Sequence, residues 1–311
     1  MAQLEANYKD QLQVAYRHYP LKDIHDKALL ATQGAEAAGL QGKFWEMHDL
    51  LFERQQEWAG FSEDQFEEWL IEQADKLDLD VDQFQTDLNS SGLVQLAEQA
   101  HEYNYSIGMP GTPFLVINGL PYGGPRDYGN LDAVVKTILL EQYQYDECPP
   151  MDIDPEVKYL ATLNTEKGEI VIELYADKAP MAVNNFIFLA RQGWYDDITF
   201  HRVIPGFVAQ GGDPSGTGLG SPGYAFENEV SDDLVFDGPG IVAMANSGPD
   251  TNGSQFFITY AATPQLNGSY TIFGRVIAGM DVVEQLSPRD PRESMDLPPG
   301  DQILSVTIEE Q

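Results

Sequence analysis

A chain of 311 residues with a formal net charge of −33 is long enough to bury two hydrophobic cores. The acidic excess is shared almost equally by the two halves, and a field of that sign repels phosphate backbones, so nucleic-acid binding is not expected. A solubilising surface is the simplest interpretation of this charge. No apolar run approaches the roughly 18 residues that span a bilayer, and the first residues lack a signal-peptide pattern, so the sequence predicts no transmembrane segment.

The titratable side chains do not predict a metal or redox centre. The single cysteine, Cys148, cannot form an intramolecular disulfide or a Cys-x-x-Cys pair. The five histidines show no zinc-ligand spacing with the cysteine or with one another. Asp152, Asp154 and Glu156 alternate as calcium ligands can, but the glycine and the distant glutamate of an EF-hand loop are missing, which favours a solvated segment. We expect no metal and no other cofactor.

The first half is predicted to be mostly helical. Residues 11–18 have the pattern of a short strand, and residues 44–52 present an apolar helical face. The capping-box pattern that begins at Ser62 predicts a helix over 63–74, and a further helix is expected over 92–103.

The end of this half has a hairpin pattern followed by a break in composition. Residues 111–119, GTPFLVING, are predicted as a buried strand that ends at Asn-Gly, with a short hairpin partner and a last helix near 130–142. The stretch 145–157, YDECPPMDIDPEV, contains paired prolines and clustered carboxylates, which resist both helix and sheet. We therefore predict a linker over 145–156.

After the linker the hydrophobic period changes to two. Residues 158–163 and 169–174 alternate as half-buried strands joined by a turn. A helix follows with Pro180 in its first turn, and a second short helix is expected at about 279–286 before a last strand at 303–309. Many short strands between Gly/Pro turns predict a closed β-barrel capped by two helices.

Three segments of the second half stand out: FHRVIPGFVAQGGD at 200–213, MANSGPDTNGSQFFI at 244–258 and LNGSYTIFGRV at 266–276. They resemble the signature segments of the cyclophilins, in the order and close to the spacing of that family, and the likeness covers nearly all of residues 157–311. The resemblance implies an all-β barrel with peptidyl-prolyl cis–trans isomerase activity.

The residue types also fit this reaction chemically. An X-Pro bond isomerises over a barrier of roughly 18–20 kcal/mol because twisting destroys amide resonance. Lowering that barrier requires no nucleophile; it requires a fixed donor near the prolyl nitrogen and an apolar pocket for the ring. Arg202 can supply the donor because a guanidinium is rigidly forked and always charged. Such a bond strengthens as the amide twists, which is the differential binding that catalysis needs.

The resemblance assigns roles to individual positions. Arg202, Gln210 and Asn246 occupy catalytic positions: Gln210 is expected to hold Arg202 and the carbonyl region of the substrate, and Asn246 with Ala245 to pair with the peptide backbone. Phe207, Phe257 and Leu266 are expected to line the proline pocket with Val208 beside them, and Gln255 to border the neighbouring groove. The implied substrate-binding residues are Phe207, Val208, Ala245, Gln255, Phe257, Leu266 and Tyr270.

A plainer interpretation of the same residues is that the aromatic side chains are only core and that Arg202 is a surface ion-pair partner. An isomerase site is favoured over this interpretation because all of these positions match the cyclophilin segments together. His201 is expected to be a structural histidine with satisfied hydrogen bonds rather than a proton carrier.

Two positions depart from the cyclophilin pattern. Gln265 stands where many members carry a tryptophan, which removes an indole donor used in recognising cyclosporin and predicts reduced drug sensitivity. Tyr270 stands where a histidine is frequent, which is expected to change the rate modestly. Neither departure removes the donor or the proline pocket.

The first half resembles the DsbA-like branch of the thioredoxin fold. The residues that carry this likeness are VAYRHYPL at 14–21, GKFWEMHDLLFE at 42–53 and GMPGTPFLVING at 108–119, and it spans about residues 1–142. In that family a Thr-Pro pair before the buried strand has a cis peptide bond, so the resemblance implies that Pro113 is cis.

The central strand and the Cys-x-x-Cys of that family would precede Met1, so two interpretations remain open. The chain is a truncated form of a longer redox protein, or its thioredoxin-like domain is degenerate and retained for binding. An extracytoplasmic location is expected in the first case and a cytoplasmic one otherwise.

We therefore expect a folding factor of two domains: a truncated DsbA-like α/β domain with a helical insertion at 1–144, a linker at 145–156 and a cyclophilin-type domain at 157–311. Its substrates are expected to be X-Pro segments of unfolded or flexible polypeptides. The alternative is a proline-binding or chaperone module with negligible turnover. A thiol-disulfide oxidoreductase is excluded for this chain by its cysteine count. Nothing in the sequence indicates an oligomeric state.

Overall fold

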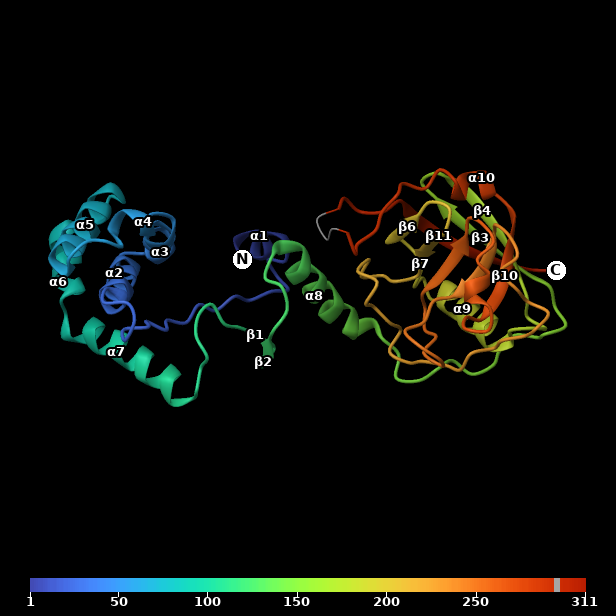
Figure 1. Ribbon diagram of the computed structural model, residues 1–311, viewed down its shortest axis with the longest axis horizontal. Coiled ribbons are helices and arrows are strands. Elements are labelled where there is room, and N and C mark those ends of the chain that lie inside the picture. The colour runs from blue at the N-terminus through green and yellow to red at the C-terminus, as the bar shows by residue number, and fades with distance from the viewer. Residues whose placement is uncertain (294–296) are drawn as a thin grey trace. The chain divides into compact units, whose positions relative to one another are not determined.

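The computed structural model describes residues 1–293 and 297–311. The chain divides into two compact units, one of Gln13–Gly124 and one that combines Met1–Leu12 with Pro125–Gln311 (Figure 1). Each unit has a hydrophobic core of its own. Among the described residues, no helix is long and apolar enough to cross a membrane.

The unit Gln13–Gly124 is built from helices around a small core. Its most deeply buried side chains are Met47, Phe66, Leu70 and Phe84. Helix α2 approaches α5 closely because it presents Gly34, where a β-carbon would lie 2.9 Å from Leu70 Cδ2. The helices are α2 (Ala28–Leu40), α3 (Phe44–Glu53), α4 (Gln55–Trp58), α5 (Glu63–Lys76), α6 (Val81–Leu88) and α7 (Ser91–Ser106).

The predicted helices of this unit are present, and the capping box at Ser62 is confirmed. The Ser62 hydroxyl accepts from the Gln65 amide at 3.3 Å, and the Gln65 side chain accepts from the Ser62 amide at 3.0 Å. Helices α2, α4 and α6 were not predicted. The α2 sequence is rich in alanine and glycine and shows little contrast between its faces, so periodicity gives no signal for it.

The predicted strand over 11–18 is wrong, because this segment is held by side chains rather than by a neighbouring strand. The carbonyl of His18 accepts from Asn104 Nδ2 at 3.0 Å, and the carbonyl of Pro20 pairs with the ring of His101 at 2.8 Å. Both donors belong to α7, so the extended segment runs along this helix without joining a ladder.

The predicted hairpin is confirmed, but its first strand is not buried. Strand β1 (Leu115–Ile117) pairs with β2 (Leu120–Tyr122) in a two-stranded sheet. Val116 is 52% exposed because this small sheet has an open face. The Thr112–Pro113 peptide bond is cis, as the resemblance implied.

The second unit contains a nine-stranded antiparallel sheet that curls into a half-barrel (Figure 1). The alternating burial of β3 and β4 confirms the predicted period of two. The strand order is β5-β11-β3-β4-β10-β8-β9-β7-β6, so the ladder ends at β5 and β6 and closure of the barrel is not confirmed. The strands are β3 (Tyr159–Thr165), β4 (Gly168–Leu174), β5 (Ile198–Thr199), β6 (Arg202–Ile204), β7 (Val208–Gly211), β8 (Ile241–Met244), β9 (Phe256–Thr259), β10 (Ile272–Ala278) and β11 (Gln302–Glu310).

Helix α9 (Pro180–Arg191) fills the main core of this unit, and α10 (Met280–Val283) is the second predicted helix. Phe186 of α9 is fully buried and contacts the rings of Tyr195 and Phe256. The face of α9 that the sequence predicts to be apolar therefore lies in the core. The first amides of α9 are satisfied by a remote carboxylate: Glu229 accepts from Met181 N and Ala182 N, each at 2.9 Å.

We expect Glu229→Gln to destabilise this unit by about 1–3 kcal/mol, because one oxygen acceptor is replaced by an amide NH₂ group that faces a backbone N–H donor. Urea unfolding followed by NMR signals of α9 measures the change. Glu227→Gln removes the same charge at an exposed position and serves as the control. Equal stability of the two variants would contradict this role of Glu229.

Two helices at the start of this unit pack on each other. Helix α1 (Ala2–Asn7) precedes Tyr8, whose hydroxyl donates to Asp132 of α8 (Tyr128–Leu140) at 2.6 Å. A short 3₁₀ turn, η1 (Glu141–Tyr143), continues α8 toward the half-barrel.

The segment predicted as a linker lacks helix and strand from residue 144 to 158, as expected, but it lies against the half-barrel. Ile153 is buried in the main core, and Asn184 of α9 donates to the Pro150 carbonyl at 3.0 Å while accepting from the Asp152 amide at 2.8 Å. The segment is therefore fastened rather than free. Within 1–293 and 297–311, no cluster of three or more metal-ligating side chains is present.

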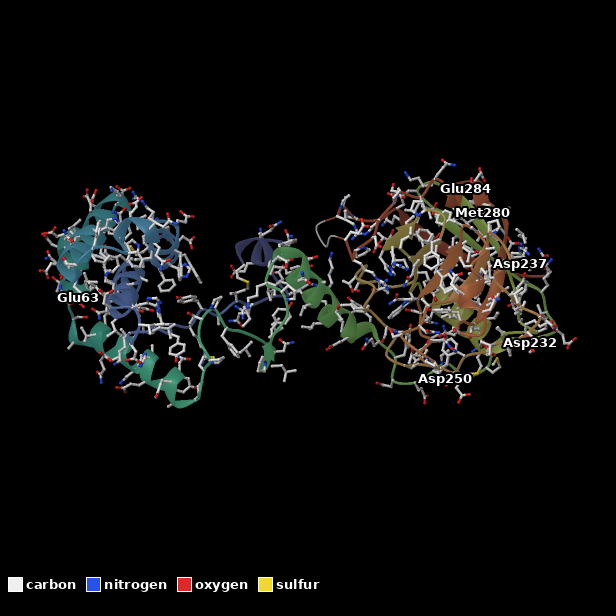
Figure 2. All side chains as sticks on the ribbon, in the orientation of Figure 1. Glu63, Asp232, Asp237, Asp250, Met280 and Glu284 are labelled. Carbon is white, nitrogen blue, oxygen red and sulfur yellow. The ribbon has the colours of Figure 1, made fainter. Side chains whose placement is uncertain are left out.

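Acidic side chains lie at exposed positions over both units. Figure 2 labels five of them, Glu63, Asp232, Asp237, Asp250 and Glu284, and each is exposed. Their distribution fits a solvated acidic surface better than one focused anionic site.

Candidate active site

The first signature segment forms the β6–β7 hairpin. Arg202 and Gln210 are direct partners across this hairpin, and Gly206 in its turn has φ of +75°, which favours glycine. Arg202 Nη1 donates to Gln210 Oε1 at 3.5 Å. The hairpin therefore places two of the three predicted catalytic side chains beside each other.

A chain of amides extends from Arg202 to a neighbouring loop. Gln255 Nε2 donates to the carbonyls of Gly218 and Gly220 at 3.0 and 2.9 Å. Only an amide NH₂ can satisfy two carbonyls, so Gln255 Oε1 must face the other way, where it accepts from Gln210 Nε2 at 3.0 Å. The Gln210 oxygen is then turned toward Arg202. The carbonyls of Gly218 and Gly220 therefore determine how both glutamine side chains are oriented, and we call these two side chains with Arg202 the amide chain.

The apolar residues predicted for the proline pocket belong to one hydrophobic cluster, separate from the main core. The ring of Phe257 packs on Phe236 with centroids 5.8 Å apart and meets Tyr270 edge-on at 5.5 Å. We call this the site cluster; its buried members are Val208, Phe236, Ile241, Ala243, Phe257 and Ile272, and its partly buried members include Phe207, Ala245, Leu266 and Tyr270.

Arg202 lies at the edge of the site cluster with part of its hydrogen-bonding capacity unused. Its Cζ is 5.9 Å from the centroid of the Phe207 ring. Its buried Nε has no hydrogen-bond partner among the described residues, and the nearest carboxylate, Asp290 Oδ1, is 3.9 Å away. Burial lowers the pKa of the guanidinium and Arg292 adds to this shift, while Asp290 and Tyr270 oppose it. The described residues therefore leave the Nε–H of this desolvated cation without a hydrogen bond.

In the second signature segment, several polar groups already form hydrogen bonds within the protein. The Ala245 amide donates to the Gln255 carbonyl at 2.8 Å, so it is not free to pair with a peptide. Asn246 Nδ2 donates to the Ser269 carbonyl at 3.1 Å, and its Oδ1 accepts from the Gly248 amide at 3.3 Å. The side chain of Asn246 is thus held in place beside the site cluster.

His201 is buried, as a structural histidine should be, but the expectation of satisfied hydrogen bonds is wrong. It is 2% exposed, and neither ring nitrogen has a hydrogen-bond partner among the described residues. Burial lowers its pKa to about 4, with Asp213 opposing the shift. The ring is therefore neutral at pH 7.

Two residues that shape the site, Phe236 and Asp290, were not predicted from the sequence. Phe236 supports Phe257 from a Gly/Pro-rich loop with no periodic pattern, so only its aromatic character could have marked it. Asp290 comes from a loop far along the chain, where no sequence signal links it to Arg202.

The fold and the residues gathered at this site point to a proline isomerase, and comparison with known proteins identifies the family. Residues 160–308 match the family model "Cyclophilin type peptidyl-prolyl cis-trans isomerase/CLD", and residues 1–137 match the model "Thioredoxin". The chain belongs to the cyclophilin-type peptidyl-prolyl cis-trans isomerases, with a thioredoxin-like region before the isomerase domain.

Two relatives found by sequence agree with this assignment. The peptidyl-prolyl cis-trans isomerase ppi1 of Schizosaccharomyces pombe is 54% identical over 127 residues, which cover 40% of this chain and 82% of that protein. The peptidyl-prolyl cis-trans isomerase CYP18-2 of Arabidopsis thaliana is 48% identical over 140 residues, covering 44% of this chain and 83% of the relative. A cyclophilin-type isomerase of Cryptosporidium parvum aligns in structure with a TM-score of 0.46 and 38% identity, over 50% of this chain and 99% of that one.

Proposed function

We propose that Arg202 stabilises the twisted amide of an X-Pro bond while Phe207, Phe257 and Leu266 hold the proline ring, and that this activity assists the folding of client polypeptides. The observation that carries the proposal is the position of Arg202 at the edge of the site cluster, with an Nε–H that has no hydrogen-bond partner among the described residues. A planar amide offers the guanidinium little at its nitrogen, whereas a twisted amide offers a localised lone pair. The donor therefore binds the transition state more strongly than the substrate.

The remaining predicted residues have supporting roles in this proposal. Gln210 orients Arg202 and contacts the carbonyl region of the substrate, and Gln255 borders the adjoining groove. Val208 and Tyr270 complete the apolar wall around the proline. Asn246 and Ala245 pair with the peptide backbone; because the Ala245 amide is already engaged, this pairing uses the other polar groups of the segment.

The proposal also includes the predicted domains, 1–144, 145–156 and 157–311, and closure of the barrel. Closure is supported by the end strands of the ladder: β5 and β6 lie in one stretch of chain, with Ile198 paired to β11 and Arg202 paired to β7. A single segment that contacts both ends of the sheet joins them without a direct β5–β6 pair.

The direct test is isomerisation of a short Ala-Pro peptide by the full chain in a protease-coupled assay. A rate proportional to protein concentration supports the enzyme. If the folded protein binds the peptide but leaves the rate at the uncatalysed value, the proline-binding module is the correct function instead. NMR line broadening of the peptide distinguishes binding from exchange between the two isomers.

Cyclosporin should inhibit this protein weakly, because Gln265 is exposed and supplies no indole donor. We expect Gln265→Trp to increase cyclosporin affinity by about tenfold, the value of roughly one recovered hydrogen bond of 1–1.5 kcal/mol. Titration of each protein with cyclosporin, at concentrations adjusted to equal uninhibited activity, measures the change. Gln265→Phe is the control, because it adds an aromatic ring without the N–H. Equal inhibition of all three proteins would contradict this role of Gln265.

A further inference from the structure

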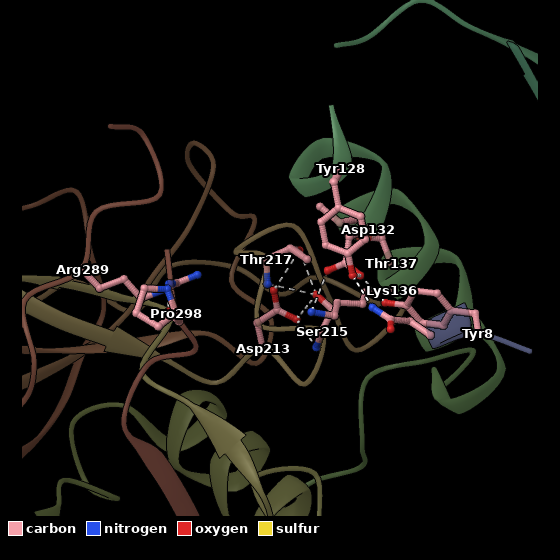
Figure 3. Close-up of polar contacts among 12 residues, drawn as sticks. Tyr8, Tyr128, Asp132, Lys136, Thr137, Asp213, Ser215, Thr217, Arg289 and Pro298 are labelled. Atoms are coloured by element: carbon pink, nitrogen blue, oxygen red, sulfur yellow. Dashed lines mark hydrogen bonds and ion pairs between the residues drawn. The ribbon is translucent and has the colours of Figure 1, made fainter. Parts of the chain in front are cut away.

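The loop at residues 213–223, which we call the support loop, is wound around one buried carboxylate. Asp213 is fully buried, and its carboxylate accepts from the backbone amides of Ser215, Gly218 and Gly220 at 2.8, 2.7 and 3.0 Å. The Ser215 hydroxyl donates to it at 2.6 Å. Figure 3 shows Asp213, Ser215 and Thr217 turned toward one another. Every one of these contacts requires an acceptor at Asp213.

The same loop provides the carbonyls that orient the amide chain of the site. Gly218 and Gly220 each donate an N–H to Asp213 and accept from Gln255 through their carbonyls. The position of the loop backbone therefore determines where Gln255 lies. Through Gln255 and Gln210, it also determines where Arg202 lies.

A second segment, residues 140–145, presses on the far end of this loop; we call it the strap. Leu140 is 6% exposed and lies so close that a β-carbon on Gly220 would be 2.8 Å from its Cδ2. Gln144 Nε2 donates to the Ser221 carbonyl at 3.0 Å, and the Tyr145 amide donates to the Pro222 carbonyl at 2.8 Å.

The strap is itself anchored, so it can hold the loop. The Tyr145 ring contacts Phe188, Trp194 and Tyr224, at centroid distances of 5.1, 6.1 and 6.4 Å. Gly223 has no room for a side chain, since a β-carbon there would lie 2.9 Å from Gln144 Cβ. The strap continues helix α8 and lies between the residues matched by the thioredoxin model and those matched by the isomerase model.

We propose that the strap positions the isomerase site, acting with Asp213 on the support loop and through it on Gln255, Gln210 and Arg202. This rests on the proposed role of Arg202. Leu140 and Asp213 are positioning residues, because they act on the guanidinium through the loop and not on the substrate. The end of helix α8, a helix that the thioredoxin model matches up to residue 137, thus contributes to the isomerase site.

The test is a double-mutant cycle in the full chain, read as kcat/KM on the Ala-Pro peptide. We expect Leu140→Ala and Asp213→Asn each to lower kcat/KM by about tenfold, since a displacement of the guanidinium by a fraction of an ångström is enough for this loss. In a Gln255→Ala background, where the chain is already broken, each substitution should have an effect below about twofold. A role in stability alone would instead give the same loss in both backgrounds.

Glu229→Gln is the matched control, because it also removes a carboxylate that holds backbone amides, and among the described residues Glu229 makes no hydrogen bond to Gln255, Gln210 or Arg202. It should lower stability and leave kcat/KM unchanged. Additive losses, or unchanged rates in Leu140→Ala and Asp213→Asn, overturn the proposal. If Asp213→Asn does not fold, Leu140→Ala decides alone. If the wild type has no activity, the function of Arg202 fails, and the strap is then judged by whether Leu140→Ala shifts the side-chain NMR signals of Gln255 and Gln210; unshifted signals overturn it.

Discussion

Replacement of Arg202 by alanine should reduce kcat/KM by about 100- to 1,000-fold, the range found when one preorganised transition-state donor is removed. The Nε–H has no hydrogen-bond partner among the described residues and only a 3.9 Å ion pair with Asp290, so the guanidinium keeps a donor for the twisted amide. The site cluster remains intact in this variant because Arg202 only borders it. The loss should therefore appear mainly in kcat, with little change in KM, and saturation kinetics on the Ala-Pro peptide measure both.

Two further variants separate geometry from charge. Arg202→Lys keeps the cation but loses the forked donor, so it should recover only a small part of the activity. Arg275→Ala removes an exposed arginine of the same unit and should leave the rate unchanged. A rate for Arg202→Ala within threefold of the wild type would show that Arg202 is not the donor, and the site cluster alone would then have to account for catalysis.

The isomerase half was predictable because its signals are local. Residues of β3 and β4 alternate between core and surface, and this alternation is written directly in the sequence. The β6–β7 hairpin brings Arg202 and Gln210 together within nine residues, so one short motif contains both. Part of the site cluster also lies in the three motifs, including Phe207, Phe257 and Leu266, whereas Phe236, Ile241 and Ala243 lie outside them.

The parts that the sequence did not predict depend on contacts between distant residues. The segment over 11–18 has a strand pattern, but the side chains of α7 satisfy its carbonyls and no ladder forms. Phe236 reaches Phe257 from an irregular loop, and Leu140 reaches Gly220 across 80 positions of sequence. Pairing partners of this kind are chosen by tertiary packing, on which local propensity and periodicity carry no information.

The acidic, proline-rich stretch over 145–157 is packed on the half-barrel and is not a free linker. Its composition correctly indicated that neither helix nor strand forms, yet composition does not distinguish a free tether from a fastened one. Tyr145 and Ile153 are the apolar residues that make the difference, and each contacts the half-barrel. A few apolar side chains within a polar stretch are therefore the feature that indicates docking.

Acidification from pH 7 to pH 4 should destabilise the half-barrel by about 3 kcal/mol through His201 alone. Burial lowers the pKa of this histidine from 6.5 to about 4; Asp213 opposes the shift, and Arg289 and Arg202 add to it. The unfolded chain therefore binds more protons than the folded chain between these two pKa values. The free energy of unfolding must fall as the pH falls through this window, and below about pH 4 this group has no further effect. Urea unfolding at pH 7, 5.5 and 4, followed by NMR signals of β3 and β4, measures the slope.

His201→Leu isolates this contribution from the carboxylates that also titrate in acid. Neither ring nitrogen has a partner within the described residues, so the substitution removes no hydrogen bond and should change stability at pH 7 by less than about 1 kcal/mol. The variant should lose less stability than the wild type between pH 7 and pH 4, and the difference between the two curves is the effect of His201. His25→Leu, at an exposed histidine outside the half-barrel, should follow the wild type. Parallel curves for His201→Leu and the wild type would mean that the imidazole is protonated without cost in the folded protein. Because the support loop lies against this ring at Gly218, such a result would require the loop to open in acid and admit water.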